Sequence, residues 1–205
     1  MTRQFSARSL LLTAAISALV LGVGPRIAAE GPLAVNTARI TIAGTSNVHD
    51  WTAETTLAKV TRVQFAAETA GASFWEEVQK PGALTAFDIS IPATSLKSDK
   101  EGLDKNMFKA LKTREHPEIT FKLARLEGTG ALLKASGTLQ IAGVEREITL
   151  PLKTTRKEAM LSVTGEVDVL MTDYGIAPPK AMMGMIKSDP KIKVTFELVL
   201  ALATT

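Results

Sequence analysis

The chain has 205 residues, of which 24 are basic and 21 acidic, and it contains no cysteine. Residues 1–29 hold three arginines and no acidic residue, so the remaining chain is neutral overall and lacks the basic balance of nucleic-acid-binding proteins. The lack of cysteine excludes disulfide bonds and a lipid-modified cysteine.

Residues 1–29 have the pattern of a secretory signal peptide. Basic residues precede an apolar run from Leu10 to Val23, and Ala28-Ala29 supplies the small residues of a cleavage site. The run is shorter than the roughly 20 apolar residues of a membrane-spanning helix, although an uncleaved anchor stays open as the alternative. We therefore expect a periplasmic protein without stable membrane insertion, whose mature part, residues 30–205, is a single domain.

Beyond Pro32 the apolar residues recur at every second position, which is the period of a β-strand. The pattern is clearest in "AMLSVTGEVDVL", where leucine and valine alternate with serine, threonine, glutamate and aspartate. It recurs in "RITIAG", "AFDISIPA", "EITFKLARL", "GTLQIAG", "REITLPL" and "KIKVTFELVLAL", and two further strands are expected at about 51–58 and 60–69. Strands with one apolar and one polar face are typical of an antiparallel sheet.

The stretch "AGVER" predicts a short hairpin turn, because Gly143 supplies the backbone freedom that a tight turn needs. Consecutive strands are therefore expected to pair. The strand period stops at "SDKEGLDKNMFKALKTREHPE", where Ser98 or Asp99 can cap a helix at about 98–112 and Pro117 forbids its continuation. A shorter helical turn is expected in "SFWEEV".

About eight consecutive antiparallel strands can form either a sandwich or a closed barrel. Every expected strand carries bulky apolar residues on one face, and an eight-stranded barrel has an interior just large enough for one slender ligand. The pattern therefore favours an all-β fold, an extended antiparallel β-barrel of about eight strands with one inserted α-helix at about 98–112.

The stretch "GTSNVHDW", residues 44–51, raises the question of a catalytic site. His49 and Asp50 are neighbours on a strand, so their side chains point to opposite faces and the aspartate cannot orient the imidazole. Ser46 also lacks the Gly-x-Ser-x-Gly frame of an exposed nucleophile. We favour a structural interpretation, in which Asp50 and Asn47 satisfy turn amides, His49 lies at a barrel end and Trp51 packs inward.

The composition gives little support to a metal site. The chain has two histidines and no cysteine, whereas zinc and copper sites need three or four converging nitrogen or sulfur ligands. Met182, Met183 and Met185 could bind copper(I), but flexible apolar filler at a pocket mouth is the favoured interpretation. We therefore expect no metal, no catalytic residues and no enzymatic activity.

Three stretches occur in the order found in a known family. They are "LKSDKEGLDKNMFKALKTREHPEITFKL", "GTLQIAGVEREITLPL" and "TDYGI", and "GTSNVHDW" is similar to the opening signature of one branch. Over about residues 36–202 the chain resembles the YceI-like family of periplasmic, polyisoprenoid-binding proteins. The resemblance implies a lipocalin-like, extended eight-stranded barrel that encloses a long polyisoprenoid chain, such as a quinone tail, and it implies no catalytic residues.

The leading hypothesis is a soluble periplasmic carrier for a polyisoprenoid or similar long-chain amphiphilic lipid, with no cofactor besides the bound lipid. Two alternatives stay open: a lipid-modifying enzyme that uses His49 as its base, which requires His49 to face the cavity, and an interaction module with a filled barrel. Whether the protein is a homodimer also stays open.

The expected ligand-binding residues are apolar side chains on the inner faces of the strands and on the helix. The helix is expected to cover a mouth of the barrel as a gate, with Met107 and Phe108 turned toward the lipid. The full set is Trp51, Phe65, Phe87, Ile89, Ile91, Met107, Phe108, Phe121, Leu139, Ile148, Val163 and Phe196.

Overall fold

The computed structural model describes residues 33–66, 74–181, 183 and 185–202, so the expected signal peptide lies outside the described residues. Most of the described chain is β-strand, as the alternating pattern predicts. The strands are β1 (Leu33–Ser46), β2 (Trp51–Thr55), β3 (Lys59–Phe65), β4 (Leu84–Pro92), β5 (Glu118–Thr129), β6 (Leu132–Ile141), β7 (Val144–Lys157), β8 (Met160–Leu170), β9 (Lys180–Ala181) and β10 (Ile186–Leu202).

The strands form one antiparallel sheet in the order β2-β1-β10-β8-β7-β6-β5-β4-β3, with β9 paired to β10. Consecutive strands from β3 to β8 are neighbours, as expected. The turn between β6 and β7 contains Ala142 and Gly143, both at positive φ (50° and 82°), which suits a two-residue hairpin. The last strand, β10, returns to lie between β1 and β8. The prediction of an all-β, lipocalin-like antiparallel fold is confirmed.

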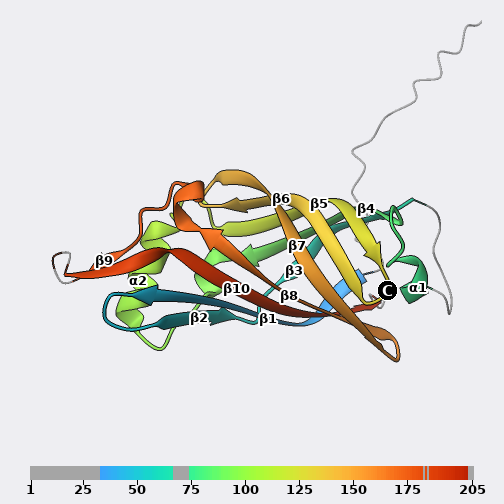
Figure 1. The fold of residues 1–205 in the computed structure, drawn as a ribbon, viewed down its shortest axis with the longest axis horizontal. Helices are drawn as coiled ribbons and strands as arrows, with labels where there is room; N and C mark the ends of the chain where they lie inside the picture. Colours follow the sequence, from blue (N-terminus) through green and yellow to red (C-terminus); the bar gives the residue numbers. More distant parts are fainter. Residues whose placement is uncertain (1–32, 67–73, 182, 184, 203–205) are drawn as a thin grey trace, which may run out of the picture.

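The sheet curls into an elongated barrel whose hydrogen-bonded ladder is not a full circle (Figure 1). In the described part of the chain, the edge strands β2 and β3 do not pair with each other. Instead, the free edge of β2 meets the segment that follows β4, where Glu54 and Lys97 exchange two backbone hydrogen bonds of 2.7 and 2.9 Å. This bridge closes the seam at one point.

Short helices cover the two ends of the barrel (Figure 1). They are α1 (Phe74–Glu77), α2 (Glu101–Ala110) and two 3-10 turns, η1 (Ala93–Ser95) and η2 (Met171–Tyr174). Helix α2 starts three residues later than the expected 98–112 because residues 98–100 form a tight turn, in which the Ser98 hydroxyl accepts the Lys100 amide at 3.2 Å. At the opposite end, Phe74 and Trp75 of α1 are buried in a cluster with Leu33 and Leu200.

Candidate functional site

A cavity of about 270 Å³ runs inside the barrel, and its wall is almost wholly apolar. Its lining reaches from Leu33 at the α1 end to Trp51, which lies opposite Gly44. That stretch of β1 is about 35 Å long at the rise of an extended strand. The volume is just below the roughly 300–1,000 Å³ of common ligand sites, and it is spread along the barrel, so the cavity suits a slender molecule rather than a compact one.

Strand alternation explains why the wall is apolar. From Ile192 onward, the side chains of β10 that line the cavity are Ile192, Val194, Phe196, Leu198 and Leu200, with the intervening residues on the outer face. Ion pairs lie on that outer face, such as Lys193 with Glu166 at 3.3 Å from Nζ to Oε1. The same period in the other strands gives the cavity its hydrocarbon surface.

Helix α2 closes one end of the cavity with its apolar face. Leu103, Met107, Ala110 and Leu111 all line the cavity, and they are the residues that recur at helical spacing in the sequence. Phe108 does not line it. The Phe108 ring instead lies 4.6 Å from the Lys97 ammonium, measured to the ring centroid, so the expectation that Phe108 faces the ligand does not match its position.

Nine of the twelve expected ligand-binding residues come together around this cavity, and their contact with a ligand stays a prediction. Phe65 packs edge-on against Phe74 outside the lining, and Ile148 packs beside the buried cluster that contains Met171. The alternating pattern identifies the inner face, whereas the extent of the cavity along each strand depends on packing. The nine lining residues are Trp51, Phe87, Ile89, Ile91, Met107, Phe121, Leu139, Val163 and Phe196.

Two polar lining residues at the α1 end were not expected from the sequence. Thr154 of β7 is 5% exposed, and its hydroxyl donates to the Gln79 side-chain oxygen at 2.8 Å. The Gln79 amide in turn donates to the Trp75 carbonyl. No sequence signal links Gln79 and Thr154, because the two residues meet only through the tertiary fold.

The turn after β1 has a structural role. The Ser46 hydroxyl donates to the His49 carbonyl at 2.7 Å and accepts the amides of Val48 and His49. Ser46, rather than the expected Asp50, therefore satisfies the turn amides. His49 and Asp50 are exposed, and His49 does not line the cavity, so the requirement for His49 to act as a base on a bound ligand is not met.

Asn47 joins this turn to the start of β10. Its side-chain oxygen accepts the Lys187 amide at 2.8 Å, and its side-chain nitrogen donates to the Met185 carbonyl at 2.9 Å. Asn47 thus satisfies backbone groups, as expected. The side chains of Met183 and Met185 are exposed to solvent and do not line the cavity, and Met182 lies outside the described residues.

Trp51 packs inward, as expected, and its indole lies against Gly44 on the neighbouring strand. A Cβ atom at Gly44 would lie 2.3 Å from Cζ2 of the indole, so only glycine leaves room for the ring. The indole Nε1 is buried and has no hydrogen-bond partner within the described residues. A buried donor without an acceptor is uncommon and costly.

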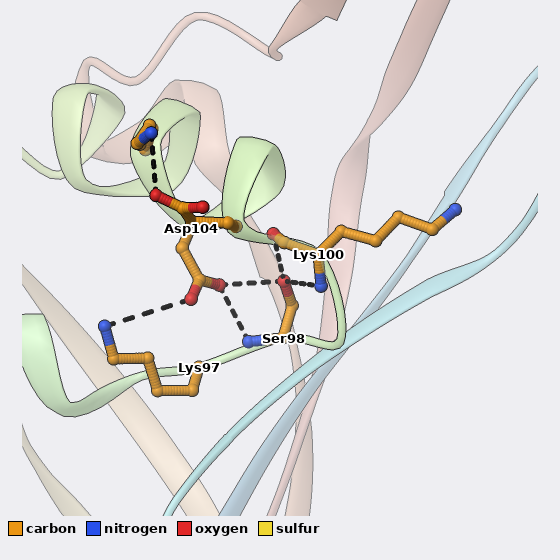
Figure 2. Close-up of polar contacts among 6 residues, drawn as sticks. Lys97, Ser98, Lys100 and Asp104 are labelled. Atoms are coloured by element: carbon orange, nitrogen blue, oxygen red, sulfur yellow. Dashed lines mark hydrogen bonds and ion pairs between the residues drawn. The ribbon is translucent and has the colours of Figure 1, made fainter.

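Asp104 holds the start of α2 in place (Figure 2). Its carboxylate accepts the Ser98 amide at 2.8 Å and the Ser98 hydroxyl at 2.7 Å, and Lys97 Nζ lies 3.9 Å away. Burial by itself raises the pKa of Asp104, but the two hydrogen bonds from Ser98 and the Lys97 charge outweigh it, so the pKa lies below its ordinary value. The carboxylate is therefore ionised at neutral pH and positions the helix that carries Met107.

Tyr174 of η2 is a further lining residue that is almost fully buried. Burial raises the pKa of its phenol, the Asp173 carboxylate raises it further, and Arg146 acts in the opposite direction. Tyr174 therefore remains a neutral phenol at physiological pH. It lies in the stretch "TDYGI" that carries part of the family resemblance.

Two other properties bear on function. Among residues 33–66, 74–181, 183 and 185–202, no three histidine, cysteine, aspartate or glutamate side chains are grouped so that they could hold a metal ion. In the same part of the chain, no helix has the length and apolar character needed to cross a membrane.

Comparison with known proteins gives one family and several similar structures. The family model described as "YceI-like domain" matches residues 35–200. No curated protein sequence matches the chain. Among solved structures, BcnA from Burkholderia cenocepacia superposes with a TM-score of 0.62 at 13% identity, covering 82% of this chain and 96% of the other.

Two further structures have the same fold. A polyisoprenoid-binding domain from Saccharophagus degradans, implicated in plant cell wall breakdown, has a TM-score of 0.61 at 14% identity and covers 85% of this chain and 100% of its own. A YceI protein from Campylobacter jejuni has a TM-score of 0.51 at 15% identity, covering 73% and 85%. At these identities the likeness establishes the fold.

Proposed function

The chain belongs to the YceI-like family, and from that premise we propose that it is a periplasmic binding and carrier protein for a polyisoprenoid or a similar long-chain lipid. One observation carries the proposal: a slender, almost wholly apolar cavity extends through the barrel between α1 and α2. Transfer of each methylene from water into such a cavity contributes about 0.8 kcal/mol, so a long hydrocarbon chain needs few polar contacts to bind.

Three further observations support lipid binding over the alternatives. The side chains leave an unfilled cavity along the inside of the barrel. This favours a ligand-binding protein over an interaction module whose interior is filled by its own side chains. The exposed position of His49 removes the one residue that we considered as a catalytic base. The structural neighbour from S. degradans is a polyisoprenoid-binding domain, which agrees with the apolar chemistry of the cavity. We therefore favour binding without chemistry.

A periplasmic location is supported by the sequence of residues 1–29, with its basic start, short apolar run and small-residue end. A soluble carrier in this compartment would shield an isoprenoid chain from water while it moves between membranes. The donor and acceptor of the lipid are not part of the proposal.

The test uses the full chain expressed in a bacterium. We expect the protein to be recovered from the osmotic-shock fraction with a mature start at or near Glu30, and native mass spectrometry to detect bound lipid or uptake from an isoprenoid quinone mixture. Val163→Phe narrows the cavity and should reduce uptake, whereas Thr164→Phe on the opposite face should not. Recovery without lipid, and no uptake by the wild type, would refute lipid binding.

A further inference from the structure

We propose that the head group of the bound lipid lies at the Trp51 end of the cavity, where the indole N–H donates a hydrogen bond to a carbonyl or hydroxyl oxygen, and that the tail runs toward α1. The inference rests on the proposed lipid binding. It adds a direction to the bound molecule and a chemical requirement, an oxygen acceptor at one end of a long apolar chain.

The first observation is the unpaired donor at Trp51. This side chain lines the cavity, and its Nε1 is buried without a hydrogen-bond partner among the described residues. A buried N–H that loses water and gains no acceptor costs about 1–3 kcal/mol. An oxygen atom of a molecule in the cavity would restore the missing bond, so a ligand with an acceptor at this end is favoured over a pure hydrocarbon.

The second observation is that the indole is held firmly. Trp51 pairs with Gly44, and the ring occupies the space that a Gly44 side chain would fill. Gly44 pairs on its other side with Ile192 of β10, so the ring lies on a continuous part of the sheet. A donor in a fixed position loses little freedom when it binds an acceptor, which strengthens its selectivity.

The third observation concerns the opposite end of the cavity. The polar side chains there are Gln79 and Thr154, and both already bond to the protein. The Thr154 hydroxyl donates to Gln79, and the Gln79 amide donates to the Trp75 carbonyl. These two residues close the α1 end without leaving a buried donor unpaired, so that end suits the hydrocarbon tail.

The wall between the two ends is apolar and has no preference for either direction of a chain, so the ends decide the orientation. Trp51 and the α1 end are separated by about 35 Å of β1, which is long enough for an extended isoprenoid chain to lie between them. The unpaired donor at one end and the engaged polar groups at the other both orient the head group toward Trp51.

The experiment compares two ligands with the same tail: geranylgeraniol, and the hydrocarbon that carries hydrogen in place of its hydroxyl. Trp51→Phe keeps an aromatic ring but removes the N–H donor. We expect this variant to raise the Kd of the alcohol about three- to tenfold, measured by displacement of a hydrophobic dye, and to leave the Kd of the hydrocarbon unchanged. Trp75→Phe, which alters a residue outside the cavity lining, should change neither value.

At saturating ligand, the same two variants also report the orientation, because the chain has two tryptophans and each variant retains one. A quinone with a ten-carbon tail quenches the fluorescence of a nearby indole. We expect stronger quenching in Trp75→Phe, which retains Trp51, than in Trp51→Phe.

Any of three results would overturn the proposed orientation while lipid binding stands. Trp51→Phe could lose affinity equally for the alcohol and the hydrocarbon, it could lose affinity for neither, or the quinone could quench Trp75 more strongly than Trp51. A wild-type protein that takes up neither ligand would refute lipid binding itself.

Discussion

At the scale of single residues, Asp104 is the buried charge on which the position of α2 depends. It is 7% exposed and accepts two hydrogen bonds from Ser98. Asp104→Asn removes the charge that strengthens these bonds, so we expect the free energy of unfolding at pH 7 to fall by about 1.5–3 kcal/mol, as measured by urea denaturation. Asp99→Asn, an exposed change in the same turn, should have an effect within about 0.5 kcal/mol.

The difference in the free energy of unfolding between the wild type and Asp104→Asn depends on pH, because the pKa of Asp104 is lowered in the folded state. The folded-state pKa of Asp104 lies below its ordinary value of 3.8, so the carboxylate stabilises the fold fully above that value. The contribution is lost as the pH falls through the folded-state pKa. The difference between wild type and Asp104→Asn should therefore be constant from pH 5 to 7 and shrink in stronger acid. A difference that grows on acidification would contradict the assignment.

At the scale of elements, two neighbouring residues of α2 have different roles. Met107 lines the cavity, whereas Phe108 packs beneath Lys97 outside it. Met107→Ala removes side-chain atoms that contact the lipid, so its Kd for geranylgeraniol should rise about threefold or more. Phe108→Ala should instead lower the free energy of unfolding by roughly 2–4 kcal/mol and leave that Kd unchanged, because a half-buried ring is lost from the packing.

A change of lipid affinity in Phe108→Ala that equals or exceeds that in Met107→Ala would restore Phe108 as a gate residue. Both variants keep the length and caps of α2, so circular dichroism at neutral pH should show no loss of helix in either.

At the scale of the whole molecule, a backbone bridge joins the edge of β2 to the segment that follows η1 and so holds the seam of the barrel. Glu54 and Lys97 form a hydrogen-bonded antiparallel pair, for which Cα atoms are about 5.5 Å apart, within the range of about 4.4–6.8 Å that a disulfide spans. We expect Glu54→Cys with Lys97→Cys to form a disulfide, without competing thiols because the chain has no cysteine.

The oxidised double variant should be more stable than its reduced form by about 2–4 kcal/mol, measured by denaturation of one preparation with and without reductant. The reduced protein is the matched control because it carries the same substitutions. Free thiols that persist under oxidising conditions would show that β2 and the segment after η1 are not held together.

Much of this molecule could be predicted from local patterns. The alternation in residues 159–170 predicted β8, and the turn at Gly143 predicted the β6–β7 hairpin, because side-chain direction in a strand and turn geometry depend on neighbours in the chain. The stop in the strand period after Lys97 likewise predicted helix α2, whose residues Leu103 and Met107 line the cavity.

By itself, the sequence determined the type of the long strands and of helix α2, and which face of each strand is apolar. Only the tertiary structure decided what those faces meet: β10 lies between β1 and β8, Glu54 bonds to Lys97, and Gln79 meets Thr154 across the cavity end. The same packing left Phe65, Phe108 and Ile148 outside the lining, and it left the Trp51 N–H without a partner among the described residues. The physical reason is that such contacts join residues far apart in the chain, whose distances depend on sheet curvature and register rather than on local periodicity.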